Sequence, residues 1–159
     1  MSDAKHHAPT LTTSLGLLVL RLAFGGYMVT HGWAKVQMIR AGQYEMMGDP
    51  IGLGPTASLW LVAAAEFGCA ILVMLGLGTR LAALPIAFAM GVAALVAHKA
   101  DPWTMGGAYE LFMAGQTKMP VSKQPAVLFL AAFLALALTG AGRLSLDNLI
   151  ARRWRRRKA

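Results

Sequence analysis

The stretch SLWLVAAAEFGCAILVMLGLGTRLAALPIAFAMGVAALVA, residues 58–97, contains two apolar segments separated only by the tripeptide GTR at 78–80. The first segment covers residues 58–77 and the second covers residues 81–97. A helix needs about 20 residues, within a range of roughly 17–25, to cross the hydrocarbon of a bilayer. Because backbone polar groups in lipid must bond within their own segment, both segments are predicted to be membrane-spanning helices. The three-residue connection forces them into an antiparallel hairpin.

Two further apolar stretches flank this hairpin, at residues 15–36 and 126–142. The 159-residue chain is 57% hydrophobic and only 14% charged, whereas soluble domains carry roughly 25% charged residues. This excess of apolar side chains needs lipid around it. The sequence therefore predicts an all-α integral membrane protein, built as an antiparallel bundle of four transmembrane helices.

The two remaining connections, residues 37–57 and 98–125, are long and rich in Gly, Pro and Met. Structureless loops of that length are uncommon, so we expect short interfacial helices in both outer loops, one of them near residues 108–115. No signal-peptide cleavage site follows the start of the chain, and the first apolar segment is expected to stay in the protein. The predicted organisation is a cytoplasmic leader at 1–14, a four-helix transmembrane domain at 15–150 and a basic cytoplasmic tail at 151–159.

Lysine and arginine residues are divided unequally between the two sides of the predicted bundle. The side that holds both termini has nine, six of them in the tail RRWRRRKA at 152–159, and the opposite side has five. Because basic loops stay on the cytoplasmic side, both termini are predicted to be cytoplasmic. Basic residues next to a membrane are attracted to anionic lipid by about 1 kcal/mol each. The net charge of +8 therefore indicates a membrane anchor, and no nucleic-acid partner is expected.

A few ionisable residues interrupt the apolar stretches, where such side chains cost at least about 2.5 kcal/mol near the bilayer centre and generally face protein or water. His31 and Glu66 lie about 8 and 12 Å below the outer end of their helices. Lys35 follows His31 by one helical turn on the same face, and His98 closes the third helix on that side. Glu66, the only acidic residue in the four stretches, is expected to pair with Arg21 or His31. The sequence thus predicts a polar pocket in the outer half of the bundle, formed by Arg21, His31, Lys35, Glu66 and His98.

The same residues also have a structural interpretation. Arg21 and Lys35 can extend along the helix to the lipid headgroups, and a hydrogen bond between His31 and Glu66 can simply fix the helix register. No residue is assigned a catalytic role, and the sequence has no zinc motif, P-loop or GxGxxG. The single cysteine, Cys69, excludes an internal disulfide. No metal and no intrinsic cofactor are therefore expected.

Three segments resemble the DoxX family of membrane proteins. LRLAFGGYMVTHGWAKV at 20–36 has an RLxxG…HGxxK pattern, AAAEFGCAILVMLGLGTRLAAL at 63–84 has a glutamate followed by GLxTR, and ALALTGAGRLSLDNLI at 135–150 ends in TGxGRxSLD. The resemblance implies a four-helix protein of the bacterial inner membrane, in a family that includes small subunits linked to quinone-dependent oxidoreductases, thiosulfate:quinone oxidoreductase among them. The matching motif positions are Arg21, His31, Lys35, Glu66, Arg80, Arg143, Ser145 and Asp147.

The end of the fourth helix also has a local physical interpretation. Gly140 and Gly142 can terminate the helix, because glycine adopts the left-handed cap without a steric penalty. Ser145 or Asp147 can then cap a short amphipathic helix, residues 146–154, at the cytoplasmic surface.

Three functions fit these features. The first is a membrane subunit or partner of a quinone-linked oxidoreductase, in which histidine and lysine donate hydrogen bonds to quinone carbonyls and a Glu/His pair moves the accompanying proton. In this hypothesis the chain is an accessory subunit rather than a self-sufficient enzyme, and quinone is its cofactor class. The second is a small carrier or channel for an anionic or protonatable solute. The third is a structural membrane adaptor without chemistry of its own.

The expected partners are the lipid bilayer and either a redox partner protein or further copies of the chain.

Overall fold

The computed structural model describes residues 10–158, and these residues form helices and no strand. Four helical rods make up the bundle: α1 (Leu11–Arg40), a second rod of α2 (Pro55–Ala63), η2 (Ala64–Cys69) and α3 (Ala70–Leu75), a third rod of α4 (Thr79–Val92) and η3 (Ala93–Ala97), and α6 (Gln124–Thr139). The shorter elements are η1 (Tyr44–Met47), α5 (Met105–Met113) and α7 (Leu146–Lys158). The predicted all-α class is confirmed.

Three of the rods are long and apolar enough to cross a membrane: α1, the second rod with 21 residues and the third rod with 19 residues. Helix α6 is also apolar but has 16 residues, which corresponds to about 24 Å at 1.5 Å per residue. The hydrocarbon core is about 30 Å thick. The count of four membrane spans therefore stays a prediction.

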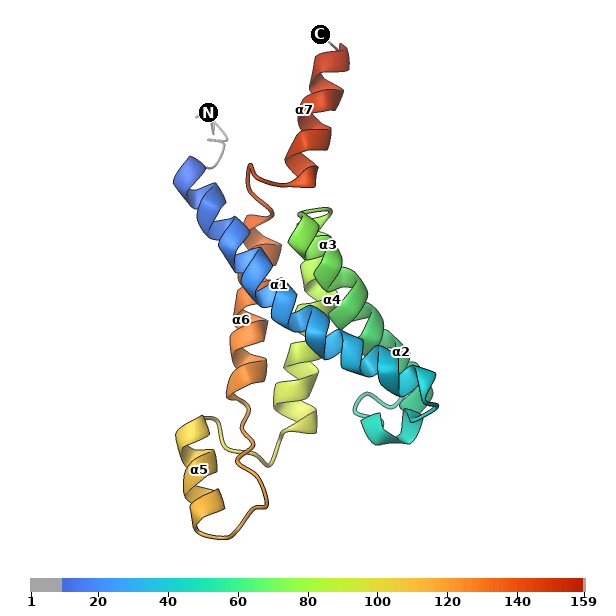
Figure 1. The fold of residues 1–159 in the computed structure, drawn as a ribbon, viewed down its shortest axis with the longest axis vertical. Coiled ribbons are helices and arrows are strands. Elements are labelled where there is room, and N and C mark those ends of the chain that lie inside the picture. Colours follow the sequence, from blue (N-terminus) through green and yellow to red (C-terminus); the bar gives the residue numbers. More distant parts are fainter. Residues whose placement is uncertain (1–9, 159) are drawn as a thin grey trace, which may run out of the picture.

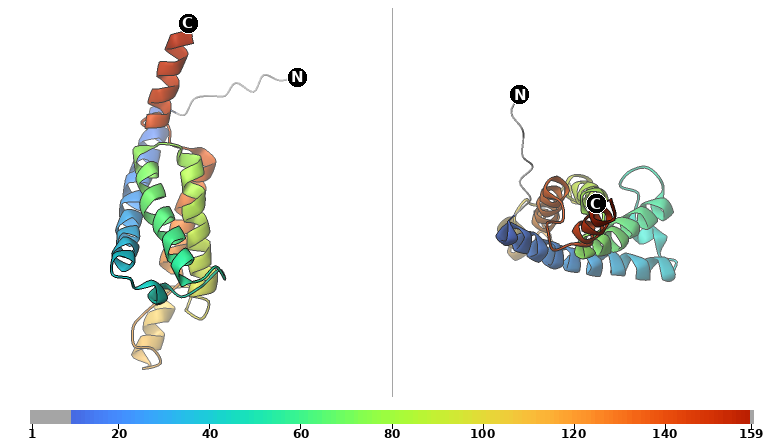
Figure 2. Two further views of the ribbon diagram at one scale, coloured as in Figure 1. Left: turned by 90° about the vertical axis from the view of Figure 1, so that its right-hand side faces the viewer. Right: turned by 90° about the horizontal axis from the view of Figure 1, so that it is seen from above.

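The two ends of the bundle differ in what they hold (Figure 1). The start of α1, the turn between α3 and α4, and α7 lie at one end, which we call the terminal end. The connections with η1 and α5 lie at the opposite end, which we call the loop end. Helix α1 crosses the second rod obliquely and also contacts α6, while α4 packs most extensively against α6. Figure 2 shows that α7 projects beyond the bundle.

The interior of the bundle contains many small side chains, and its exterior exposes large apolar ones. Alanines of α4 such as Ala83 and Ala87 share the buried core with Phe133 of α6. In contrast, Leu81 and Leu138 are 77% and 78% exposed. Helices in a bilayer pack through small residues, because lipid surrounds their large apolar side chains. The outer surface is thus suited to lipid.

Local signals explain why the rods begin and end where they do. The Thr10 hydroxyl accepts a hydrogen bond from the Thr13 N–H at 3.2 Å and caps α1, so this helix begins before the predicted residue 15. The backbone at Gly76 and Gly78 has positive φ angles of 70° and 57°. Glycine adopts that conformation at little steric cost, so these residues form the tight turn between α3 and α4.

Two rods contain a π-helical segment, η2 in the second rod and η3 in the third. A π-helical turn holds an extra residue and shifts the faces of the helix that follow it, and such turns occur frequently at functional sites. Glu66 lies within η2, and His98 directly follows η3. The apolar composition that predicts the spans does not reveal either segment.

Candidate functional site

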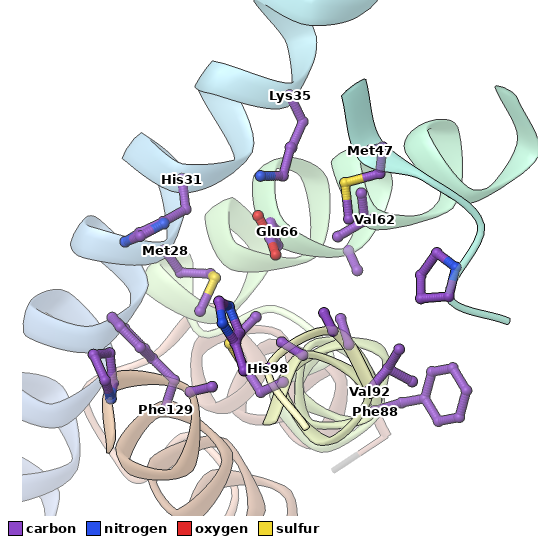
Figure 3. Close-up of a pocket in the computed structure, with 18 of the residues that line it drawn as sticks. Met28, His31, Lys35, Met47, Val62, Glu66, Phe88, Val92, His98 and Phe129 are labelled. Atoms are coloured by element: carbon purple, nitrogen blue, oxygen red, sulfur yellow. The ribbon is translucent and has the colours of Figure 1, made fainter. Parts of the chain in front are cut away.

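A cavity of about 610 Å³ lies between the loop-end halves of the helices (Figure 3). Its lining is mostly apolar and comes from all four rods and both long connections. Of the five residues predicted to form a polar pocket, four line this cavity: His31, Lys35, Glu66 and His98. We call these four side chains the polar set of the cavity.

Glu66 is the buried member of the polar set. Its side chain is 5% exposed, and its Oε2 atom has no hydrogen-bond partner among the described residues. Lys35 is the basic residue that interacts electrostatically with it, and Figure 3 shows the lysine amine pointing toward the carboxyl group. A buried charge is costly unless it is paired. Both side chains line the cavity, and the Lys35 charge is the one that acts on the Glu66 carboxyl.

A close approach of two backbones positions Glu66 against α1. A Cβ atom added to Gly32 would lie 2.3 Å from the Phe67 N atom and 2.5 Å from the Glu66 carbonyl carbon. Only glycine permits such proximity. Because Gly32 lies between His31 and Lys35 in the sequence, this contact fixes both side chains relative to Glu66.

His31 contacts the aromatic ring of Phe129 rather than the Glu66 carboxyl. It is exposed, and its imidazole meets Phe129 of α6 edge to face, with the ring centroids 5.8 Å apart. The expected pairing of Glu66 with His31 or Arg21 is not found, because His31 meets Phe129 and Arg21 binds carbonyls of Val73, Met74 and Leu144. Lys35 is the basic residue whose charge acts on Glu66.

His98 is oriented by an aspartate of the following loop. Its Nδ1 atom and Asp101 Oδ2 lie 2.7 Å apart. The partner of one ring nitrogen sets the role of the other, so Nε2 is the nitrogen left for a ligand. Figure 3 shows the His98 ring on the same side of the cavity as Met28 and Glu66.

Methionines make up a large share of the apolar lining. Met28, Met47, Met90 and Met105 come from α1, η1, α4 and α5, respectively. The thioether side chain is flexible and polarisable, and it adapts its shape to an irregular apolar partner. The cavity is thus able to adjust to a lipophilic ligand.

The loop before α2 closes one side of the cavity with Pro50 and Ile51. Asp49 holds this loop, because its Oδ1 atom accepts hydrogen bonds from the Leu53 N–H at 2.9 Å and the Ser58 hydroxyl at 3.1 Å. Hydrogen bonds from backbone N–H groups, that of Gly54 above all, hold the pKa of Asp49 below its ordinary value. The charged carboxylate therefore stabilises the closed loop.

Arg21 does not line the cavity, which corrects its predicted place in the pocket. It is fully buried toward the terminal end, where Nη1 donates to the Val73 and Met74 carbonyls at 3.4 and 3.3 Å and Nη2 donates to the Leu144 carbonyl. The carbonyls in the last turn of a helix lack intrahelical partners and carry partial negative charge. Arg21 thus binds the end of α3 to the segment before α7.

The remaining motif residues meet at the same end. The carboxylate of Asp147 accepts hydrogen bonds from the Gly78 and Thr79 N–H groups at 2.8 and 3.3 Å, which caps α4. The Ser145 hydroxyl accepts from the Asn148 N–H at 3.2 Å and caps α7. Arg80 and Arg143 line a second hollow next to these caps. The GLxTR and GRxSLD motifs therefore form one junction, distant in sequence and adjacent in space.

The DoxX family model matches residues 16–99, which include α1, the second rod and the third rod. The chain belongs to the DoxX family. The inner membrane protein YqjF of Escherichia coli strain K12 is similar, with 29% identity over 140 residues that cover 88% of this chain and 95% of that protein. No solved structure matches the chain. The expected family is thus confirmed, and this DoxX chain is a membrane protein whose polar set lies entirely within the matched residues.

Several features of the site were not predicted from the sequence. Asp101 lies three residues after His98, and this spacing was a usable signal for their pairing. Gly32 stands inside the HGxxK pattern, although a glycine in a helix has many causes. The contact of Phe129 with His31 and the two π-helical segments depend on how the DoxX rods pack and have no local signature.

Proposed function

We propose that this DoxX-family chain is the membrane-embedded subunit of a quinone-linked redox system and that its cavity binds the quinone headgroup. The observation that carries the proposal is the combination of a largely apolar cavity of about 610 Å³ with a buried carboxyl whose Oε2 atom has no hydrogen-bond partner within residues 10–158. Small-molecule sites are typically about 300–1,000 Å³, apolar, and equipped with a few polar groups that orient the ligand. The cavity has these properties.

The donors and acceptors of the cavity suit a flat ring with two carbonyl oxygens. The Lys35 ammonium can donate hydrogen bonds to such oxygens. Because Nδ1 of His98 faces the Asp101 carboxylate, Nε2 of the neutral ring accepts a hydrogen bond from a quinol hydroxyl, and it donates to a quinone carbonyl only when the ring is doubly protonated. The methionines with Phe129 supply an apolar surface for the ring. A bound quinone supplies two-electron, two-proton chemistry, and a separate cofactor-bearing oxidoreductase supplies the electrons. Glu66 can hold or release a proton in the cavity, and Lys35 stabilises its charged form.

Binding of decylubiquinone to the purified protein in detergent micelles tests this function. We expect Lys35→Met and Glu66→Gln each to raise the Kd at least about tenfold. A hydrogen bond to a charged group contributes about 1.5–3 kcal/mol, and about 1.4 kcal/mol corresponds to a tenfold change in affinity. Quenching of tryptophan fluorescence measures the binding, since Trp33 lies on α1 near the loop end.

Lys118→Met and Glu110→Gln are the matched controls, because they change the same charges at exposed positions outside the cavity. Both controls should keep the Kd of the unmodified chain. An equal Kd in all four variants would contradict the proposed site. Uptake of an anionic solute into proteoliposomes, lost in Lys35→Met, would instead support the carrier hypothesis.

We further propose that α6 is the fourth span and that the terminal end faces the cytoplasm of a bacterial inner membrane. Helix α6 packs along α4, which is itself part of a rod long enough to cross. Arg80, Arg143 and the arginines of α7 gather at the terminal end, as expected for the cytoplasmic side. The E. coli relative is an inner membrane protein by name.

Labelling of introduced cysteines in spheroplasts tests this topology. In a Cys69→Ala background, Gln116→Cys should react with a membrane-impermeant maleimide from outside. Arg156→Cys should react only after permeabilisation, because an odd number of spans lies between the two positions if α6 crosses. Equal reactivity of both positions would show that α6 does not span the membrane. Cys69→Ala protein without an introduced cysteine, treated in the same way, is the background control.

A further inference from the structure

A second hollow, of about 720 Å³, opens at the terminal end between the start of α4, the end of α6 and the first turns of α7. Four arginines line it, against a single aspartate: Arg80, Arg143, Arg152, Arg155 and Asp147. We call it the arginine hollow. The Asp147 carboxylate is engaged by two backbone N–H groups of the α3–α4 turn. The hollow therefore presents an excess of positive charge at the edge of the membrane.

The arginines of α7 in this hollow belong to one face of the helix. Asn148, Arg152 and Arg155 are spaced by four and three residues, which places them on neighbouring turns of the same side. Arg153, Arg156 and Arg157 do not line the hollow. Helix α7 otherwise projects away from the bundle (Figure 1), so its first turns alone close the hollow on that side.

Exposed leucines of α4 and α6 lie at or next to the hollow. Leu81 lines it and is 77% exposed, and Leu138, which is 78% exposed, precedes the lining residue Thr139. Arginine binds phosphate with paired N–H groups, and exposed leucines on α4 and α6 suit acyl chains. An arginine cluster above an apolar surface therefore matches an amphiphile with a phosphate group.

We propose that the arginine hollow binds the phosphate of an anionic phospholipid. The lipid phosphate lies among the arginines of α4 and α7, and its acyl chains lie along Leu81 and the outer surface of the bundle. Bound there, the lipid holds the first turns of α7 against the start of α4. Selectivity for anionic lipid comes from the arginines, because each basic residue near the surface attracts anionic lipid.

The test compares two triple variants with the same change of net charge. Arg80→Gln/Arg152→Gln/Arg155→Gln removes three lining arginines, and Arg153→Gln/Arg156→Gln/Arg157→Gln removes three that face elsewhere. Dioleoylphosphatidylglycerol should raise the melting temperature of the unmodified protein in detergent more than dioleoylphosphatidylcholine does. The lining variant should lose that difference and weaken the apparent lipid affinity at least about tenfold. The control variant should keep the difference.

Two other results would contradict the proposed lipid site. Equal losses in both triple variants would assign the effect to diffuse attraction by the tail. Stabilisation by inorganic phosphate alone, as strong as that by phosphatidylglycerol, would assign the hollow to a soluble anion. Should the lining variant fail to fold, Arg152→Gln/Arg155→Gln, which alters exposed residues of α7 only, is compared with Arg153→Gln/Arg156→Gln, and native mass spectrometry counts the lipids retained.

Discussion

Replacing Gly32 by alanine is expected to lower the melting temperature by about 10 °C and to abolish decylubiquinone binding. The added Cβ would lie 2.3 Å from the Phe67 N atom and 2.7 Å from the Glu66 carbonyl oxygen. These are backbone atoms, so no flexible side chain can move aside, and α1 must separate from η2. Overpacking of this kind costs up to about 3 kcal/mol, and about 2–4 °C is lost per kcal/mol in a chain of this size. Thermal unfolding in detergent measures the change.

Gly26→Ala is the matched control on the same helix, since a Cβ at Gly26 would meet no atom within 4 Å. Alanine stabilises a helix by about 1 kcal/mol relative to glycine, so this variant should keep or raise the melting temperature. Its affinity for decylubiquinone should match that of the unmodified protein. Equal melting temperatures of the two variants would show that α1 and η2 do not approach closely at Gly32.

The sequence predicts the rods well because their signal is composition over a long window. The apolar stretch at 58–77 is found as Pro55–Leu75 in the structure, and the one at 81–97 is found within Thr79–Ala97. The ends of α1 differ more, because the Thr10 cap and the polar turn up to Arg40 extend it past the apolar stretch. Hydropathy locates the lipid-facing part of a helix and does not locate its caps.

The site is only partly predictable, since its pairings depend on rotation of the rods. Depth along the helix predicts His31, Lys35, Glu66 and His98 at one level, and all four line the same cavity. The π-helical segment around Glu66 changes which side of the second rod faces α1, and the period of an ordinary helix does not include that change. The basic residue whose charge acts on Glu66 is Lys35, one turn beyond the predicted His31.

Arg21 shows a second limit of the prediction. Its long side chain can reach toward either end of α1, and the sequence alone allowed a pocket or the lipid headgroups as its destination. The structure directs it toward the terminal end, as in the headgroup alternative, and buries it against protein carbonyls rather than lipid. Gly76 leaves room for the Arg21 guanidinium, because a Cβ atom added to Gly76 would lie 2.2 Å from Arg21 Nη1.

Replacing Arg21 by leucine is expected to cause the largest loss of stability in the bundle. The Met74 and Leu144 carbonyls would lose the Arg21 donor, and the Val73 carbonyl would keep only the Gly76 N–H. A buried acceptor left unsatisfied costs about 1–3 kcal/mol, so two of them correspond to a fall of about 10 °C in melting temperature. The segment before α7 should also be released, so trypsin should cleave after Arg143 faster than in the unmodified protein.

Arg21→Lys separates the role of charge from the role of geometry. An ammonium group retains the positive charge but lacks the planar fork that reaches the end of α3 and Leu144 together, so we expect only partial recovery of stability and of protection from trypsin. Arg40→Leu, at an exposed position of the same helix, is the control and should leave cleavage after Arg143 unchanged. Full recovery in Arg21→Lys would mean that a point charge suffices at this junction. Unchanged unfolding of Arg21→Leu would mean that the junction between α3 and α7 is held by Asp147 and Ser145 alone.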